Sequence, residues 1–201
     1  MSHEIEAKFD VDDFRAVRRV LRQAAARYIA TVVQTDTYYD TSTGMLRGRN
    51  CGLRIREVHC LRRGDAPVDT RPVLTAKGPP RLPASSRDRS SGVRRAKVRR
   101  ELQTHLDDPE AVCELFEAMG LRRTMTVQKR RATYRLRRCM IELDELPVIG
   151  RYVEIEAPSE RKLDAMRRRL NLPGEPITDH YLNLLARAAN DSRRRTFLLE
   201  S

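Results

Sequence analysis

Charged side chains alternate with apolar ones in short runs of this chain, and this alternation constrains its fold more than any other feature. The first run, HEIEAKF, places Glu4, Glu6 and Lys8 two residues apart. Side chains two residues apart along a β-strand lie on the same face. If the run is a strand, two carboxylates and an amine share one face, and Ile5 and Ala7 lie on the other.

The same alternation recurs in five later runs. Its members are Arg54 and Arg56 in GLRIR, Thr75 and Lys77 in VLTAKG, Lys129 and Arg131 in VQKRRATY, Glu142 and Asp144 in MIELDEL, and Glu154 and Glu156 in YVEIEA. One such run is equally typical of a half-buried strand with an ordinary wet face. Six runs that separate into cationic and acidic strands, with little neutral filler, favour one enclosed, charged cavity.

The chain divides into strand-like and helix-like segments joined by short turns. Strands are expected at residues 3–9, 31–41, 52–59, 71–78, 97–105, 126–136, 139–146 and 151–157. Apolar residues at helical spacing predict helices over 12–28, from Asp107 or Asp108 to Met119, over 159–172 with Ser159 as the cap, and from about Thr178 or Asp179 to 190. Residues 79–95 read as an exposed loop, and 192–201 as a frayed end.

This order of elements predicts an α+β fold. Its centre is a closed antiparallel barrel of eight strands with a polar, charged interior, and helices pack against the apolar outside. A chain of 201 residues has room for one domain with a real core, so residues 1–201 are expected to form a single domain.

Composition limits the classes of partner. Lys+Arg 40 against Asp+Glu 28 leaves a net charge of +12, which favours polyanions such as phosphates or nucleic acid. No run approaches the roughly 18 apolar residues of a membrane span, and the first residues lack a signal-peptide core, so a cytoplasmic protein is expected. The four cysteines and four histidines lack zinc-ligand spacing. Phosphate-loop, Rossmann, nucleophile-elbow and zincin motifs are missing as well.

The lining predicted for the barrel favours a phosphate ligand with a metal. Unpaired cations in such a space would cost several kcal/mol each, and a ligand of high negative charge density offsets that cost. Arginine forks and lysine ammonium groups suit a chain of phosphates. Carboxylates would repel such a ligand unless a hard divalent cation, Mg²⁺ or Mn²⁺, lay between them. The alternative is that acids and bases pair across the barrel without any ligand.

The ordered motifs resemble those of the CYTH superfamily, the triphosphate tunnel metalloenzymes. They are E-x-E-x-K at the start, TDTYYDT, L-R-x-R, L-T-x-K-G, K-R-R, E-L-D-E-L and the late E-I-E, and together they cover nearly the whole chain. The resemblance implies an eight-stranded tunnel that binds a triphosphate or nucleoside triphosphate with a divalent metal. Members of this superfamily include inorganic triphosphatases, thiamine triphosphatases and class IV adenylyl cyclases.

The resemblance also implies roles for particular residues. Phosphate binding falls to Lys8, Arg54, Arg56, Lys77, Lys129 and Arg131, and metal binding to Glu4, Glu6, Asp144, Glu154 and Glu156, with Glu142 as a further acid. In the strand 97–105, alternation favours Arg99 and Glu101 facing inward, although a slip of one residue would exchange Arg99 for Arg100. Tyr38 and Tyr39 are interpreted as packing residues.

The predicted activity is metal-dependent hydrolysis of a triphosphate, such as tripolyphosphate, ATP or thiamine triphosphate. Glu6 is expected to help hold a metal that polarises the attacking water, and Lys8 is a candidate proton acceptor. The first alternative is an adenylyl cyclase that forms cyclic AMP and pyrophosphate, although no adenine-binding feature is recognisable. The second is a non-catalytic module that binds polyphosphate or RNA, with nucleic acid the less favoured partner.

Overall fold

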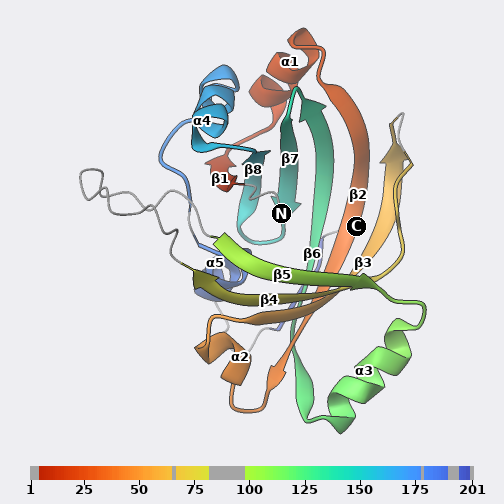
Figure 1. The fold of residues 1–201 in the computed structure, drawn as a ribbon. Coiled ribbons are helices and arrows are strands. Elements are labelled where there is room, and N and C mark those ends of the chain that lie inside the picture. Colours follow the sequence, from red (N-terminus) through yellow and green to blue (C-terminus); the bar gives the residue numbers. More distant parts are fainter. Residues whose placement is uncertain (1–4, 65–66, 82–97, 178, 190–194, 200–201) are drawn as a thin grey trace.

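A nine-stranded sheet forms the body of the computed structural model, which describes residues 5–64, 67–81, 98–177, 179–189 and 195–199 (Figure 1). The strands are β1 (Ile5–Val11), β2 (Arg27–Thr41), β3 (Gly52–Arg63), β4 (Val73–Arg81), β5 (Val98–His105), β6 (Leu121–Leu136), β7 (Cys139–Leu146), β8 (Gly150–Ala157) and β9 (Thr196–Phe197). The helices are α1 (Arg15–Gln23), α2 (Met45–Gly48), α3 (Pro109–Ala118), α4 (Glu160–Arg169) and α5 (Tyr181–Ala188).

Hydrogen bonds connect the strands in the order β1-β8-β7-β6-β2-β3-β4-β5, and β9 lies alongside β6. Among the described strands every pairing is antiparallel except that of β6 with β9. Register shifts interrupt the pairing of β2 with β3 and β6, and of β4 with β5. Such bulges bend strands and increase their twist. As a result the sheet curls, and β4 and β5 lie crosswise to β6 and β7 (Figure 1).

The closed barrel expected from the sequence is not established. β1 and β5 stand at the two ends of the strand order, and no hydrogen-bonded pairing joins them in the part of the chain that the structure describes. The free edge of β1 instead receives one bridge, in which the backbone nitrogen of Ile177 donates to the carbonyl oxygen of Lys8 at 2.7 Å. The α+β class and the antiparallel sheet are confirmed.

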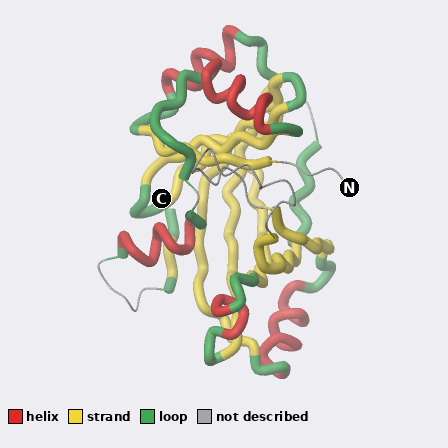
Figure 2. Tube along the Cα trace, turned by 60° about the vertical axis from the view of Figure 1, so that its left-hand side comes forward, coloured by secondary structure: helices red, strands yellow, loops and turns green. Residues whose placement is uncertain are grey.

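One face of the sheet is apolar and carries α1 and α4. Phe9, Val153 and Ile155 are fully buried there, and Leu21 of α1 and Leu163 of α4 pack against them. Figure 2 shows these helical segments lying across one side of the strands. Burying such a side chain stabilises a fold by about 1.5–3 kcal/mol. This face holds the largest core, as the alternation of the strands requires.

Two smaller cores anchor the remaining helices. α3 packs through Phe116 against Tyr39 of β2, whose ring lies 5.0 Å from that of Phe116. α5 contributes Leu185 to a cluster with Phe197 of β9 and Val127 of β6. Both Leu185 and Phe197 are fully buried. The first cluster attaches α3 to the sheet, and the second attaches α5 and β9.

The expected helix starts are confirmed at two places. The side chain of Asp108 accepts a hydrogen bond from the backbone of Ala111 at 2.9 Å, and α3 begins with Pro109. Ser159 caps α4 by accepting from the backbone of Lys162 at 3.4 Å. Side-chain oxygens at these positions satisfy amide groups that the first turn leaves unpaired. α5 begins later than expected, at Tyr181.

Several expectations about segments differ from the structure. The short helix α2 follows the turn after β2 and was not expected. β4 continues through Arg81, so the predicted loop at 79–95 begins later, and its residues 82–95 lie outside the described part of the chain. The prediction of a frayed end is wrong at Thr196 and Phe197. These residues form β9, which pairs with β6, and the side chain of Phe197 is fully buried.

None of the helices in the described ranges has both the length and the hydrophobicity that a membrane crossing needs.

Replacing Phe197 with alanine should lower the free energy of unfolding by about 3–5 kcal/mol, because it leaves a cavity between β9, β6 and α5. Leu198→Ala is the matched control, since that neighbouring side chain is 48% exposed. Denaturant titration of both variants measures the difference. A midpoint in Phe197→Ala equal to that of the control would show that β9 does not stabilise the fold.

Candidate functional site

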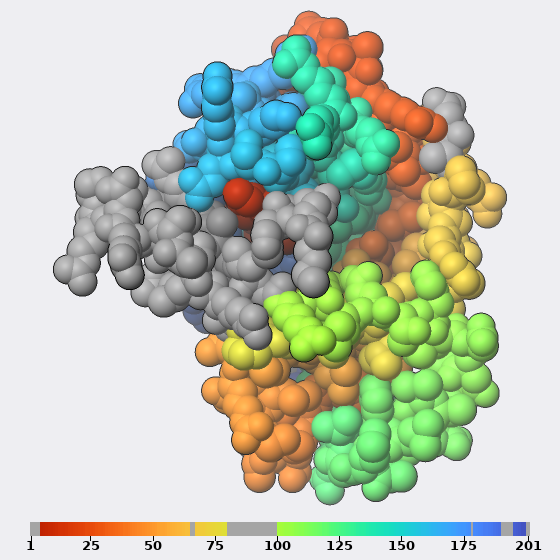
Figure 3. All heavy atoms as spheres, viewed as in Figure 1, coloured from red at the N-terminus to blue at the C-terminus, as the bar shows by residue number. Residues whose placement is uncertain are grey.

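The polar side chains of the sheet gather on the face opposite the α1 and α4 core. Along β6 and β7, Ala132 and Leu143 belong to that core, whereas Arg131 and Asp144 alternate with them and lie on the other side. We call this side the charged face. Its members with contacts described below are Lys8, Asp36, Arg54, Arg56, Lys77, Glu101, Lys129, Arg131, Glu142, Asp144 and Glu154. The molecular surface is hollowed between β5 and β6, where the sheet curls over this face (Figure 3).

Opposite charges face each other across neighbouring strands. In the strand register, Lys8 lies opposite Glu154, and Arg131 opposite Asp144. Lys77 likewise lies opposite Glu101, with 3.0 Å between the lysine nitrogen and a carboxylate oxygen. Cross-strand pairs of opposite charge stabilise a sheet modestly when exposed. On this face several are buried, so each partner removes the cost of an isolated charge.

Asp144 is the centre of the acidic half. It is fully buried; Arg131 Nε donates to its Oδ1 at 2.6 Å, and Lys129 Nζ to its Oδ2 at 3.0 Å. Burial acts to raise the pKa of Asp144, but the charges and hydrogen bonds of Arg131 and Lys129 outweigh it and hold that pKa well below its usual range. Asp144 is therefore an ionised carboxylate at neutral pH.

Arg131 joins three carboxylates. Besides Asp144, it donates to Glu154 Oε2 at 2.6 Å and forms an ion pair with Glu142. Lys8 approaches the other oxygen of Glu154 at 3.8 Å. These contacts draw side chains from β1, β6, β7 and β8 into one cluster.

Asp36 of β2 is the centre of the cationic half, and sequence reasoning missed it. Arg56 donates to both of its oxygens, at 2.6 and 2.7 Å, and Arg54 donates to Oδ2 at 3.2 Å. Burial acts to raise the pKa of Asp36, but Arg56 and Arg54 hold it well below its usual range. The missed signal was the alternation of Gln34, Asp36 and Tyr38 within the strand TVVQTDTYYDT.

Glu6 shows how closely the two ends of the curled sheet approach. Its side chain reaches solvent, yet the protein around it removes hydration and Glu154 adds a like charge, so the pKa of Glu6 is raised. Lys77, Lys8 and Arg131 act in the opposite direction. Lys77 belongs to β4 and Glu6 to β1, so charges from strands near opposite ends of the hydrogen-bonded order act on one carboxyl group.

Tyr181 of α5 is a second residue that the sequence did not indicate. Its hydroxyl donates to Asp144 Oδ2 at 3.2 Å, and its ring centre lies 3.9 Å from Lys8 Nζ and 5.4 Å from Lys129 Nζ. Lysine ammonium groups are attracted to the face of an aromatic ring. α5 therefore presents one side chain to an acid and two cations of the charged face. Tyr181 reaches the charged face only because α5, which is far from these strands in the sequence, packs against the sheet.

The predicted metal ligands that the structure describes come from the neighbouring strands β1, β8 and β7, but they do not form a ready-made metal centre. No group of three or more His, Cys, Asp or Glu side chains among the described residues has the geometry to hold an ion. Arg131 occupies the space between Glu142, Asp144 and Glu154. Glu156 lies opposite Glu6 in the register of β8 and β1. The donors fit a hard cation in type, because carboxylate oxygens are what Mg²⁺ and Mn²⁺ prefer.

Two predicted residues have side chains that the structure does not describe. Glu4 lies outside the described residues. The backbone of Arg99 belongs to β5, but its side chain is outside the described part of the structure, and the side chain of Arg100 is exposed. Their roles stay predictions.

Asp144→Asn should lower the free energy of unfolding by about 3 kcal/mol at neutral pH, because it leaves the buried Lys129 and Arg131 short of a counter-charge. Since the pKa of Asp144 is lowered on folding, its stabilisation is present above the ordinary value of 3.8 and is lost as the pH falls below it. The difference between the two proteins should therefore shrink in acid.

Chemical denaturation at several pH values measures that difference, with the exposed Asp107→Asn as the control. A variant as stable as the control at neutral pH would contradict the assignment of Asp144 as the anchor of the two cations.

Comparisons with known proteins agree with this arrangement. A family model of the CYTH domain matches residues 2–172. A protein of Methanocaldococcus jannaschii (MJ0240), provisionally named an adenylate cyclase, is 24% identical over 153 residues, which make up 76% of this chain and 75% of that protein.

Two solved structures share the fold. The PH1819 protein of Pyrococcus horikoshii superposes with a TM-score of 0.72 at 22% identity, covering 92% of this chain and 99% of that one. HpAC1 of Hippeastrum, a provisional adenylyl cyclase with a dominant triphosphatase activity, has a TM-score of 0.66 at 18% identity, covering 92% and 96%. The charged face, the strand order and the family match lead to one conclusion: this chain belongs to the CYTH domain family.

Proposed function

We propose that this protein hydrolyses a triphosphate on its charged face with the help of a divalent metal ion. The observation that carries the proposal is the gathering of cations from β1, β3, β4 and β6 on one face of the sheet. They are Lys8, Arg54, Arg56, Lys77, Lys129 and Arg131. No similar set of cations is expected on a face that serves packing alone, because buried ion pairs seldom stabilise a fold more than apolar residues would.

The cations bind the phosphate chain in this proposal. Arg54 and Arg56 come from one strand two residues apart, and their guanidinium forks match phosphate oxygens in geometry. Asp36 holds both forks in place before a ligand arrives. Lys129 and Arg131 offer a second pair from β6. Preorganised positive charge of this kind stabilises the negative charge that is redistributed during phosphoryl transfer.

The acids explain why a metal is required. Glu6 and Glu156 lie on the same face as Lys8 and Glu154, and with them the described acids of this face number seven against six cations, so a triphosphate would gain little net attraction from the protein alone. A bound Mg²⁺ or Mn²⁺ would supply further positive charge and polarise the attacking water. Glu6 on β1 and Glu154 and Glu156 on the adjacent β8 are the first proposed ligands, with Glu4, Glu142 and Asp144 completing the predicted set.

Glu6 and Lys8 are the proposed catalytic residues on β1. The Lys8 ammonium donates to the carbonyl oxygen of Asp179 at 2.9 Å and lies over the ring of Tyr181. These contacts hold Lys8 beside the cluster around Arg131, where it would bind phosphate and serve as the predicted proton acceptor. Glu6 reaches solvent and is the acid best placed to hold a hydrated metal.

Adenylyl cyclisation is the second candidate, because relatives at this level of similarity bear that provisional name. It would use the same phosphate and metal groups, with the ribose hydroxyl in place of water. A non-catalytic polyphosphate-binding module is the third.

A product assay separates these functions. Purified protein with Mg²⁺ or Mn²⁺ should release orthophosphate from tripolyphosphate, and EDTA should abolish the release, because the acids otherwise repel the substrate. Chromatography that resolves orthophosphate, pyrophosphate and cyclic AMP measures the result. Formation of cyclic AMP and pyrophosphate from ATP would assign cyclisation to the protein in place of hydrolysis. Tight binding without turnover would favour the binding module.

Glu6→Gln should lower metal-dependent turnover by about a hundredfold, because it removes a charged oxygen donor without changing the size of the side chain. Glu57→Gln is the matched control, since Glu57 lies exposed on β3, next to Arg56 and on the opposite face. Steady-state rates across a metal titration compare the two. Wild-type rates in Glu6→Gln would remove Glu6 from the metal site.

A further inference from the structure

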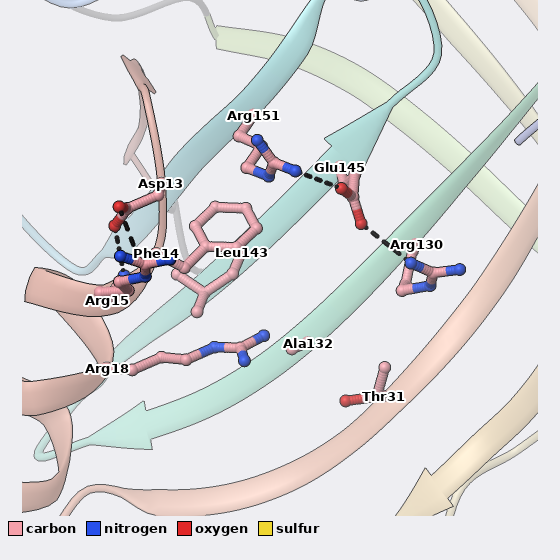
Figure 4. A pocket seen from close by; sticks show the side chains of 10 residues that line it. All are labelled: Asp13, Phe14, Arg15, Arg18, Thr31, Arg130, Ala132, Leu143, Glu145 and Arg151. Carbon is pink, nitrogen blue, oxygen red and sulfur yellow. Dashed lines mark hydrogen bonds and ion pairs between the residues drawn. The ribbon is translucent and has the colours of Figure 1, made fainter. Parts of the chain in front are cut away.

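A second cationic pocket lies on the outer side of the sheet, away from the charged face. It encloses about 480 Å³ between the start of α1 and the strands β2, β6, β7 and β8. Figure 4 shows the side chains that line it. In β6 and β7 its residues Arg130, Ala132, Leu143 and Glu145 alternate with residues of the charged face. The sheet therefore separates this pocket from the proposed active site.

Small side chains create the hollow. Thr31 and Ala132 are partners in the register of β2 and β6, and Leu143 is the next partner on β7. α1 covers the sheet through Val17 and Leu21, and its first turn borders the hollow through Arg15 and Arg18. Ala132 and Leu143, which are 4% and 1% exposed, close the apolar floor of the hollow. Phe14 borders the hollow beside Leu143 and supplies its accessible apolar wall (Figure 4).

Arginines form the rim. Arg130 donates to Glu145 at 3.0 Å, and Arg151 donates to the other oxygen of Glu145 at 2.9 Å, so one acid holds two guanidinium groups in place. On the opposite rim Arg18 extends over the floor toward Ala132 (Figure 4). Its guanidinium lies 5.7 Å from the centre of the Phe14 ring, and it forms no ion pair within the described ranges.

The charges of the pocket leave it positive. Arg15 pairs with Asp13 at 3.8 Å, and Glu145 is shared by two arginines. Arg18 and the unused donors of Arg130 and Arg151 remain for an anion. Guanidinium groups bind phosphate oxygens in pairs and also stack on flat rings.

We propose that this pocket binds a mononucleotide. Its ring would lie against Phe14, above the floor closed by Ala132 and Leu143, and its phosphate between Arg18 and the pair Arg130 and Arg151. A volume of this size lies within the range of about 300–1,000 Å³ typical of small-molecule sites. An inorganic anion would use the rim but not the apolar floor. The inference does not depend on the proposed hydrolysis, because the two sites share no residue.

Calorimetric titration of the full-length protein with AMP tests the proposal, with ribose 5-phosphate as the ligand that lacks a ring. Arg18→Glu should weaken AMP binding by at least about tenfold, because it replaces a charge-assisted contact with a repulsion. Arg19→Glu is the matched control: it changes the net charge equally, and Arg19 is an exposed neighbour outside the pocket. It should change AMP affinity less than twofold, and ribose 5-phosphate should bind at least about tenfold more weakly than AMP.

Arg56→Ala separates this pocket from the charged face. Full AMP affinity in Arg56→Ala together with a loss in Arg18→Glu would support the outer pocket. Equal losses in Arg18→Glu and Arg19→Glu would show a general effect of charge and overturn the proposal. Loss in Arg56→Ala alone would place AMP on the charged face, and ribose 5-phosphate binding as tight as AMP would remove the role of the apolar floor. Either result, or no AMP binding by the wild-type protein, would also overturn it.

Discussion

The pairing of Arg131 with Asp144 is the interaction on which the rest of the charged face depends. A fully buried carboxylate is tolerated only where charges and hydrogen bonds replace its hydration, and Arg131 and Lys129 supply both. Arg131 in turn holds Glu142 and Glu154, and Tyr181 brings α5 to the same carboxylate. The positions of three strands, β6, β7 and β8, and of the helix α5 are thus coupled through two side chains.

The apolar core on the other face supplies the stability that this charged network does not. Charged networks contribute little net stability, whereas Phe9, Val153, Ile155 and their neighbours bury large apolar surfaces under α1 and α4. Alternation along each strand connects the two faces, because every residue that enters the core places its neighbour on the charged side. A strand could not slip by one residue without exposing its core and burying the wrong charges.

Local patterns explain how much the sequence predicted. Alternation located six of the eight long strands, and it placed Arg131 and Asp144 on one face, because a period of two is a property of the strand itself. Asp36 and Tyr181 were missed, since their roles depend on which strands and helices become neighbours. The same holds for β9: TF alone carries no signal, and Phe197 is ordered only because Val127 and Leu185 lie beside it. Closure of the barrel was inferred from the number of strands. Whether β1 pairs with β5 depends on contacts between residues far apart in the sequence, which local patterns do not predict.

The ion pairs of the charged face bear directly on how a ligand could bind there. Each cation proposed to bind phosphate also has an acidic partner in the described structure, as Arg56 has Asp36 and Lys77 has Glu101. A triphosphate must therefore compete with these acids, and its binding exchanges one set of ion pairs for another. The energy of the exchange is favourable only if the displaced carboxylates gain new cationic partners, because an unpaired charge in a recess is costly. A divalent ion is such a partner, so the charge balance of the lining supports the metal ion included in the proposed function.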